Sequence, residues 1–131
     1  MELVLDTSVL IAVERNIVDF DSIKRYGNIY ICSITVAELL FGVYRADNED
    51  RKVKRSASVE HMISSIPILH FGEAEARIYA QIFCELKDKG LTVGAHDLMI
   101  GATAIAAGCK VLTMNEKDFR RISGLDVLSI V

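Results

Sequence analysis

The chain has 131 residues, 51% of them hydrophobic and only one of them proline, which is typical of a folded globular protein and excludes a disordered or fibrous one. Eighteen acidic residues against fifteen basic ones give a formal net charge of −3, which argues against a protein that holds nucleic acid by bulk positive charge. No uncharged stretch is long enough to cross a bilayer and no signal peptide is recognisable, so we expect a soluble, cytoplasmic protein with no membrane contact and a single domain over residues 1–131.

Short apolar runs bounded by turn or capping residues predict five strands. These runs lie at residues 3–5, 29–32, 66–69, 111–114 and 127–131. Segments with helical patterns separate them. Strands that alternate with helices in so short a chain predict the α/β class, with three layers and a mainly parallel central sheet flanked by helices.

Two of the intervening helices have clear ends. Residues 73–89 show apolar side chains at four-residue spacing, and Gly90 follows as a left-handed stop. A second helix, rich in small residues, is predicted to open at residues 94–97 and to stop at Gly108.

Two further helix starts are predicted from capping residues. Thr35 is followed three residues later by Glu38, a spacing that is typical of a capping box. Asn115 stands before an acidic turn and is the predicted cap of a short helix near the C-terminus.

Four acidic residues fall at predicted helix starts, three of them just after a strand: Asp6, Glu38, Asp97 and Asp118. Each of them alone is explained by capping or by the positive end of a helix. In an open parallel sheet, however, the connections at the carboxyl ends of the strands line one crevice, and all four acids belong to connections on that side. The sequence therefore predicts that the four carboxylates converge.

Converging carboxylates need a partner of opposite charge. Two like charges ~4 Å apart repel by roughly 4 kcal/mol at an effective dielectric constant near 20. Either some of the carboxyl groups take up protons or a divalent cation neutralises them, and an all-oxygen site suits Mg²⁺ or Mn²⁺. Thr7, Ser8, Thr113 and Asn115 lie beside the acids and could orient ligands or water, although turn formation and capping explain them equally well.

Basic residues are concentrated in the segment RADNEDRKVKRSAS, where we single out Arg51, Lys52 and Arg55. A solvated helix face is the simplest explanation of such a run. The alternative is contact with nucleic-acid phosphates, which would reconcile an acidic chain with a polyanionic substrate. Arg120 is a further candidate for such a contact.

An unusually dense apolar stretch occupies residues 39–44, with sequence LLFGVY. Core packing is its simplest explanation. The alternative is a groove for an amphipathic helix of a partner protein.

Four segments of the chain, taken in order, resemble the motifs of one family: LVLDTSVLIA, ITVAELLFGV, AHDLMIGATAIAAG and VLTMNEKDFRRISGL. The chain resembles the PIN-domain nucleases over nearly its whole length, and most closely the VapC-type toxins of prokaryotic toxin–antitoxin pairs. By this resemblance the acidic metal-site positions are matched by Asp6, Glu38, Asp97 and Asp118, and their polar companions by Thr7 or Ser8, Thr113 and Asn115.

The resemblance implies a magnesium- or manganese-dependent endoribonuclease, in which a metal-activated water attacks the phosphorus in line. It also implies a homodimer and a cognate VapB-type antitoxin whose C-terminal segment covers the catalytic groove. The chain departs from the family pattern at His96, where a small polar residue such as Asn is common, and at Met114, where a polar or basic residue is common. These departures concern substrate contacts, because the carboxylates are intact.

Other functions remain open at this point. A PIN-domain protein that processes RNA without being a toxin would carry the same motifs, and in a non-catalytic dimeric binding module the acids would only cap helices. An aspartyl phosphatase would use Asp6 as a nucleophile and carry a second acid where this chain has Ser8. A receiver-type signalling domain would need an acceptor Asp where His70 and Phe71 stand.

Overall fold

A parallel sheet forms the centre of the molecule, and the computed structural model describes residues 1–130. Within that range the strands are β1 (Glu2–Leu5), β2 (Asn28–Cys32), β3 (Ile68–Leu69), β4 (Lys110–Thr113) and β5 (Val127–Ser129). All neighbouring strands are parallel, in the order β3-β2-β1-β4-β5. The order of the chain through the sheet reverses between β1 and β4, so the carboxyl ends of these two strands flank the crevice in which open α/β sheets bind ligands.

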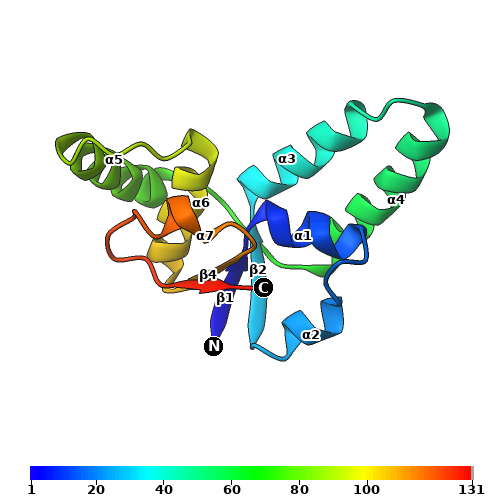
Figure 1. The fold of residues 1–131 in the computed structure, drawn as a ribbon, viewed down its shortest axis with the longest axis horizontal. Helices are drawn as coiled ribbons and strands as arrows, with labels where there is room; N and C mark the ends of the chain where they lie inside the picture. The colour runs from blue at the N-terminus through cyan, green and yellow to red at the C-terminus, as the bar shows by residue number, and fades with distance from the viewer. Residues whose placement is uncertain (131) are drawn as a thin grey trace.

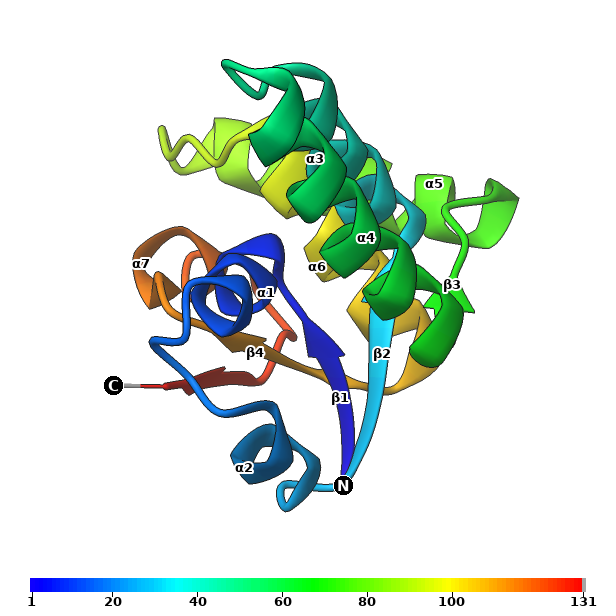
Figure 2. The ribbon, with the colours of Figure 1, turned by 90° about the vertical axis from the view of Figure 1, so that its right-hand side faces the viewer.

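Helices cover both faces of the sheet and form two lobes (Figure 1). The first lobe comprises α5 (Glu73–Asp88), α6 (Ala95–Ala107) and α7 (Glu116–Phe119), and the second comprises α1 (Thr7–Glu14), α3 (Ser33–Tyr44) and α4 (Glu49–Ser65). Figure 2 shows the remaining helix, α2 (Phe20–Lys24), beside the N-terminal ends of the strands. The predicted three-layer α/β fold is confirmed. Among residues 1–130 no helix has both the length and the apolar character needed to cross a membrane.

Successive strand residues face opposite lobes. Val4 packs in the core cluster that contains α5 and α6, whereas its neighbour Leu5 packs in the cluster that contains α1, α3 and α4. Both side chains are fully buried. Burial on both faces of the sheet explains why the strands read as uninterrupted apolar runs. Each such side chain stabilises the fold by about 1.5–3 kcal/mol relative to an exposed position.

Several predicted strand ends need correction. Ile66 is the C-cap of α4 rather than the start of a strand, because its N–H donates to the carbonyl of Met62 at 3.1 Å, and β3 begins only at Ile68. Met114 lies beyond the end of β4 and Ile130 beyond the end of β5, while the predicted last strand residue, Val131, lies outside the described residues. The predicted helix stops are confirmed, because Gly90 and Gly108 have φ values of 67° and 68°.

The predicted capping box at Thr35 and Glu38 is wrong. The helix α3 begins directly after β2, at Ser33, so both residues lie inside it. Thr35 is fully buried and hydrogen-bonds to Thr7 across 3.2 Å, rather than capping the helix. Asn115 does stand at the N-cap of α7, but its side chain makes no capping hydrogen bond there.

Candidate active site

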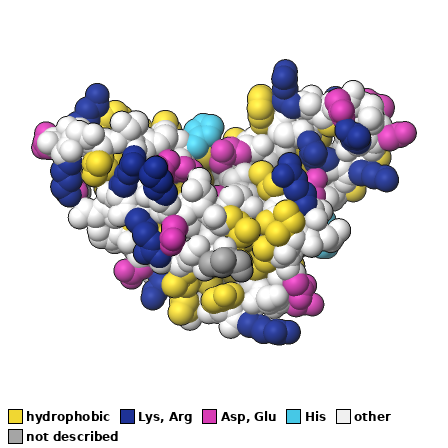
Figure 3. Space-filling model, in the orientation of Figure 1, with side chains coloured by type: hydrophobic (Ala, Val, Ile, Leu, Met, Phe, Trp, Pro, Cys, Tyr) yellow, Lys and Arg dark blue, Asp and Glu magenta, His cyan; other side chains and the backbone are white. Residues whose placement is uncertain are grey.

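A cleft of about 230 Å³ opens where β1 and β4 end. Its lining residues are Asp6, Thr7, Ser8, Ile11, Glu38, Asp97, Asn115 and Phe119. Figure 3 shows acidic side chains in the hollow between the two lobes, with Lys and Arg side chains on both walls. The structure thus brings together three of the four predicted acids. The fourth, Asp118, is not a lining residue, although its negative charge acts on Asp97.

Asp6 is the most buried of the acids and is held by hydrogen bonds from two elements. It is the N-cap of α1, and its Oδ1 accepts from the backbone N–H of Ser8 at 2.6 Å. Its Oδ2 accepts from the hydroxyl of Ser8 at 3.0 Å and from the hydroxyl of Thr113, which follows from the pairing of β1 with β4. Burial raises the pKa of Asp6, whereas the hydrogen bonds from Thr113 and Ser8 oppose that rise.

Glu38 reaches the cleft from the second turn of α3. Thr7 Oγ1 donates to its Oε1 at 2.7 Å, so the first residue of α1 fixes the carboxylate. On the opposite lobe, His96 Nδ1 lies 3.5 Å from Glu38 Oε2. The His96 side chain is 61% exposed, which makes this a solvent-screened contact across the mouth of the cleft.

Asp97 carries the clearest electrostatic sign of a carboxylate cluster. Its pKa is raised to about 6, first because the side chain is partly buried and then because the negative charges of Asp6, Glu38 and Asp118 oppose its ionisation. The neighbouring His96 acts weakly in the other direction. A carboxyl group whose pKa rises through the charges of other acids marks a site that a cation would stabilise.

The donor atoms of the cleft suit a hard divalent cation. They are carboxylate oxygens together with hydroxyl and amide oxygens, and no thiol lines the cleft. Within residues 1–130, no group of three or more His, Cys, Asp or Glu side chains is positioned to hold a metal ion. By their chemistry the residues that line the cleft suit Mg²⁺ or Mn²⁺, but their carboxylates do not form a ready-made set of ligands.

Of the four basic residues predicted to contact RNA, Arg55 reaches the edge of the cleft. It lines a second hollow of about 210 Å³ together with Ile11, Glu14, Arg15, Glu38, Leu39 and Gly42. The two hollows share Ile11 and Glu38, so they lie side by side along α1 and α3. The sequence offered no signal for Arg15 or Glu14, because their place at this hollow depends on how α4 packs against α1.

The other three basic residues lie elsewhere. Arg51 pairs with Asp47 at 2.8 Å on an exposed surface, and Arg120 pairs with Glu116 at 2.7 Å. Lys52 lies 5.8 Å from the centre of the Tyr44 ring, in a separate groove between α3 and α4. None of the three lines the acidic cleft or the hollow beside it.

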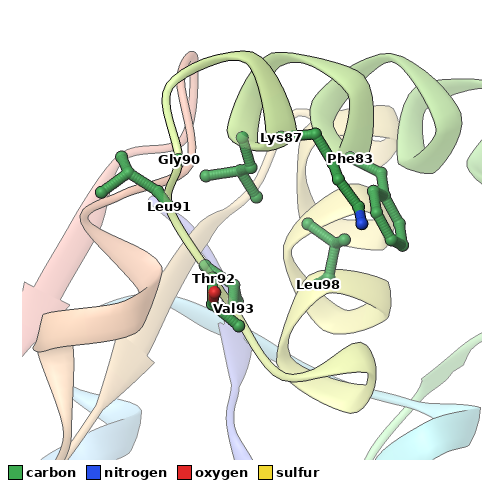
Figure 4. Close-up of a pocket in the computed structure, with 8 residues that line it drawn as sticks. Phe83, Lys87, Gly90, Leu91, Thr92, Val93 and Leu98 are labelled. Atoms are coloured by element: carbon green, nitrogen blue, oxygen red, sulfur yellow. The ribbon is translucent and has the colours of Figure 1, made fainter.

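Another hollow, of about 310 Å³, lies between the end of α5 and the start of α6 (Figure 4). It is lined by Phe83, Leu86, Lys87, Gly90, Leu91, Thr92, Val93 and Leu98. The Lys87 ammonium lies 5.5 Å from the centre of the Phe83 ring. This lining contains no carboxylate and no His or Cys side chain. The acidic cleft, where the carboxylates gather, is the candidate active site.

Known proteins with this sequence pattern share the same fold. The family model described as the PIN domain matches residues 3–125. The chain is 45% identical over 130 residues to ribonuclease VapC1 of Rickettsia felis, covering 99% of this chain and 97% of that protein. It is 33% identical over 99 residues to the tRNA(fMet)-specific endonuclease VapC of Shigella flexneri, covering 76% of this chain and 73% of that protein.

A solved structure agrees with these sequence matches. The chain superposes with a TM-score of 0.89 and 27% identity on a chain in the crystal structure of VapBC2 from Rickettsia felis bound to a promoter DNA fragment, covering all of both chains. Family model, sequence relatives and fold all lead to one assignment. The chain belongs to the PIN-domain family and, within it, to the VapC-type proteins.

Proposed function

We propose that the protein is a divalent-metal-dependent endoribonuclease and the toxin of a VapBC-type toxin–antitoxin pair. The observation that carries the proposal is the convergence of Asp6, Glu38 and Asp97 on one cleft at the reversal point of the sheet. The activity follows that of the VapC relatives, which are named as a ribonuclease and a tRNA-specific endonuclease. Which RNA this chain cuts depends on the shape of the groove.

Asp6, Glu38 and Asp97 would hold the cation, with Asp118 beside them. A bound Mg²⁺ or Mn²⁺ supplies a water of lowered pKa and stabilises charge on the leaving oxygen of the phosphodiester. The protein's own task is then to keep the carboxylates ionised and oriented.

The polar companions of the acids perform that task. Thr113 and Ser8 donate to Asp6, which favours its charged form although it is buried. Thr7, the residue after Asp6, donates to Glu38 and so fixes the second carboxylate. The Asn115 side chain lines the cleft and can donate its amide to a phosphate oxygen.

The family resemblance also supports two partners. We infer a homodimer and a VapB-type antitoxin, with residues 1–131 as one PIN domain that acts on RNA in the cytoplasm. The helix α3 offers an apolar surface for such a partner, because Phe41 and Tyr44 are 66% and 73% exposed. Leu39 and Val43 of the same helix are buried in the core, so the apolar stretch at residues 39–44 contributes both to the core and to the exposed apolar surface.

A non-catalytic binding module is the rival function, in which the acids would only cap helices. Asp6 does cap α1, but it also accepts a hydrogen bond from the hydroxyl of Thr113 at the end of β4. Glu38 and Asp97 lie inside their helices, and no side-chain capping bond is made at the start of either. Capping therefore does not account for the cluster.

Induced expression in a bacterium tests the proposed function although the target RNA is unidentified, because the cell supplies its whole range of RNAs. The wild type, Asp97→Asn and the control Asp126→Asn, an exposed residue ahead of β5, are induced at matched soluble levels. We expect growth arrest and new RNA 5′ ends with the wild type and the control, and neither with Asp97→Asn. Equal arrest with Asp97→Asn, or no new RNA ends with the wild type, would refute the assignment.

A further inference from the structure

Arg55 is held at the edge of the active site by two other helices. From α4 its Nε lies 3.3 Å from Glu14 Oε1 on α1, and its Nη1 donates to the carbonyl of Gly42 on α3 at 3.1 Å. Gly42 belongs to the last turn of α3, where the helix dipole favours a cation. These contacts fix the guanidinium and leave N–H donors available, because the group has more donors than two bonds use.

The position of Arg55 suits contact with a polyanion that lies in the cleft. Its hollow borders the acidic cleft at Ile11 and Glu38, so Arg55 would lie next to a nucleic-acid strand whose scissile phosphate lies at the carboxylates and which continues along α1 and α3. The Arg55 side chain is 37% exposed, so it is open to a ligand without being freely mobile. A planar guanidinium with free N–H groups matches a phosphate in both charge and shape.

Glu14 opposes that contact. Its side chain is 22% exposed and already pairs with the guanidinium, so a phosphate would compete with the Glu14 carboxylate for Arg55. We propose that Arg55 contacts a backbone phosphate of the RNA next to the cleavage site, and that Glu14 weakens this contact by competing for the same guanidinium. The inference rests on the proposed RNA substrate, and it assigns the two residues opposite effects on RNA binding.

Opposite effects separate this role from a structural one. If Arg55 and Glu14 only brace α1 against α4, removal of either partner breaks the same bond, and both changes lower RNA binding together. If Arg55 binds phosphate, Arg55→Gln weakens binding, whereas Glu14→Gln strengthens it. In the double variant the guanidinium of Arg55 is absent, so replacing Glu14 has no further effect and RNA binding equals that of Arg55→Gln alone.

The test is binding of fluorescently labelled, unfractionated bacterial tRNA by the full chain, in an Asp97→Asn background that stops cleavage, with Mg²⁺ present. For Arg55→Gln we expect about tenfold weaker binding, the usual loss for a charge-assisted hydrogen bond. The slope of log K against log salt should fall by about 0.7 to 0.9, which corresponds to one phosphate contact. Glu14→Gln should bind tRNA about threefold more tightly, because the phosphate no longer competes with a carboxylate for Arg55. This gain in affinity is smaller than the full contribution of a charge-assisted hydrogen bond.

Matched controls lie at the other end of the molecule. Arg25→Gln at the end of α2 and Glu2→Gln at the start of β1 make the same charge changes beside the N-terminal ends of the strands, and neither should alter affinity beyond error. Thermal unfolding of every variant shows whether the fold is intact, and Arg55→Lys, which keeps the charge, should recover part of the affinity.

The outcomes separate this inference from the proposed function. Unchanged tRNA affinity in Arg55→Gln, or a fall in both Arg55→Gln and Glu14→Gln, overturns the inference even if the wild type cleaves RNA. Opposite shifts in the two variants support it, and they would do so even if the wild type cleaved no RNA, a result that would refute the nuclease alone.

Discussion

Neutralising Asp97 should stabilise the metal-free protein. The pKa of this carboxyl group is about 6 in the folded chain, against an ordinary value of 3.8. Between these two pH values the folded protein binds a proton that the unfolded chain does not, so stability falls as pH rises through this window and levels off above about pH 7. Asn has the same shape and carries no charge to repel Asp6 and Glu38.

The magnitude follows from the same two values. At about 1.4 kcal/mol per pKa unit, the difference corresponds to about 3 kcal/mol as an upper limit. Asp97 is partly exposed, so solvent screens its charge, and its place in the first turn of α6 offsets a few tenths of a kcal/mol. We therefore expect Asp97→Asn to be more stable by about 1 kcal/mol at pH 7.5, which raises Tm by about 4 °C for a chain of this size.

Urea unfolding in EDTA at pH 7.5 and at pH 4 measures this difference. The advantage of Asp97→Asn should vanish at pH 4, where the wild-type carboxyl group is already protonated in the folded protein. Added Mn²⁺ should reverse the order at pH 7.5, because a ligand that binds the folded wild type stabilises it by mass action. Asp126→Asn, at an exposed position away from the cleft, is the control for the loss of one negative charge. Equal stability of Asp97→Asn and wild type in EDTA at pH 7.5 would refute the like-charge cluster.

Three further substitutions probe the fold and the support of the site. Thr113→Val removes a fully buried hydrogen-bond donor to Asp6, so it should cost about 1–3 kcal/mol of unfolding free energy and weaken Mn²⁺ binding in calorimetry. Unchanged Mn²⁺ affinity would contradict the role of Thr113 in supporting Asp6. Gly27→Ala should cost about 2 kcal/mol or more of unfolding free energy in urea, because φ is +144° and the new Cβ would lie 2.1 Å from the carbonyl oxygen of Met1. Unchanged stability would contradict the close approach of Met1 to Gly27. Ile82→Ala, in the core beside α5, should cost about 2–5 kcal/mol of unfolding free energy but leave the Mn²⁺ affinity of the folded protein unchanged. A loss of both stability and Mn²⁺ affinity would contradict the independence of this core from the site.

The convergence of the acids was predictable because it depends on few facts. Once β1 and β4 are parallel strands, their carboxyl ends lie on the same side, and Asp6 and Thr113 must be neighbours. The apolar runs in the sequence predicted the ends of both strands to within one residue. The same topology brings Asp97 to the crevice, because α6 leads into β4.

Glu38 lines the cleft, although the capping box predicted for it is wrong. The sequence suggested a capping box with Thr35, but the helix starts directly after β2, and a capping pattern cannot show where the preceding strand ends. The helix has three more residues at its start than predicted, so Thr35 is buried in the core and Glu38 accepts a hydrogen bond from Thr7.

The position of Arg55 in the hollow beside the cleft could not be predicted from the sequence. Arg55 meets Glu14 across a sequence separation of 41 residues, and the contact depends on the packing of α4 against α1 and α3. Arg51, one helical turn earlier, looks equivalent in the sequence but pairs with Asp47 instead. Local patterns do not distinguish two such arginines, since only the tertiary fold brings one of them to Glu38.

Direct titration with Mn²⁺ shows whether the acidic cleft is a divalent-metal site. In isothermal calorimetry at pH 7.5 the wild type should bind Mn²⁺, and Asp6→Asn, which keeps the shape of a carboxylate that is only 5% exposed, should lose at least about tenfold in affinity. Equal binding by the two proteins, or none by the wild type, would contradict the assignment of this cleft as the metal site.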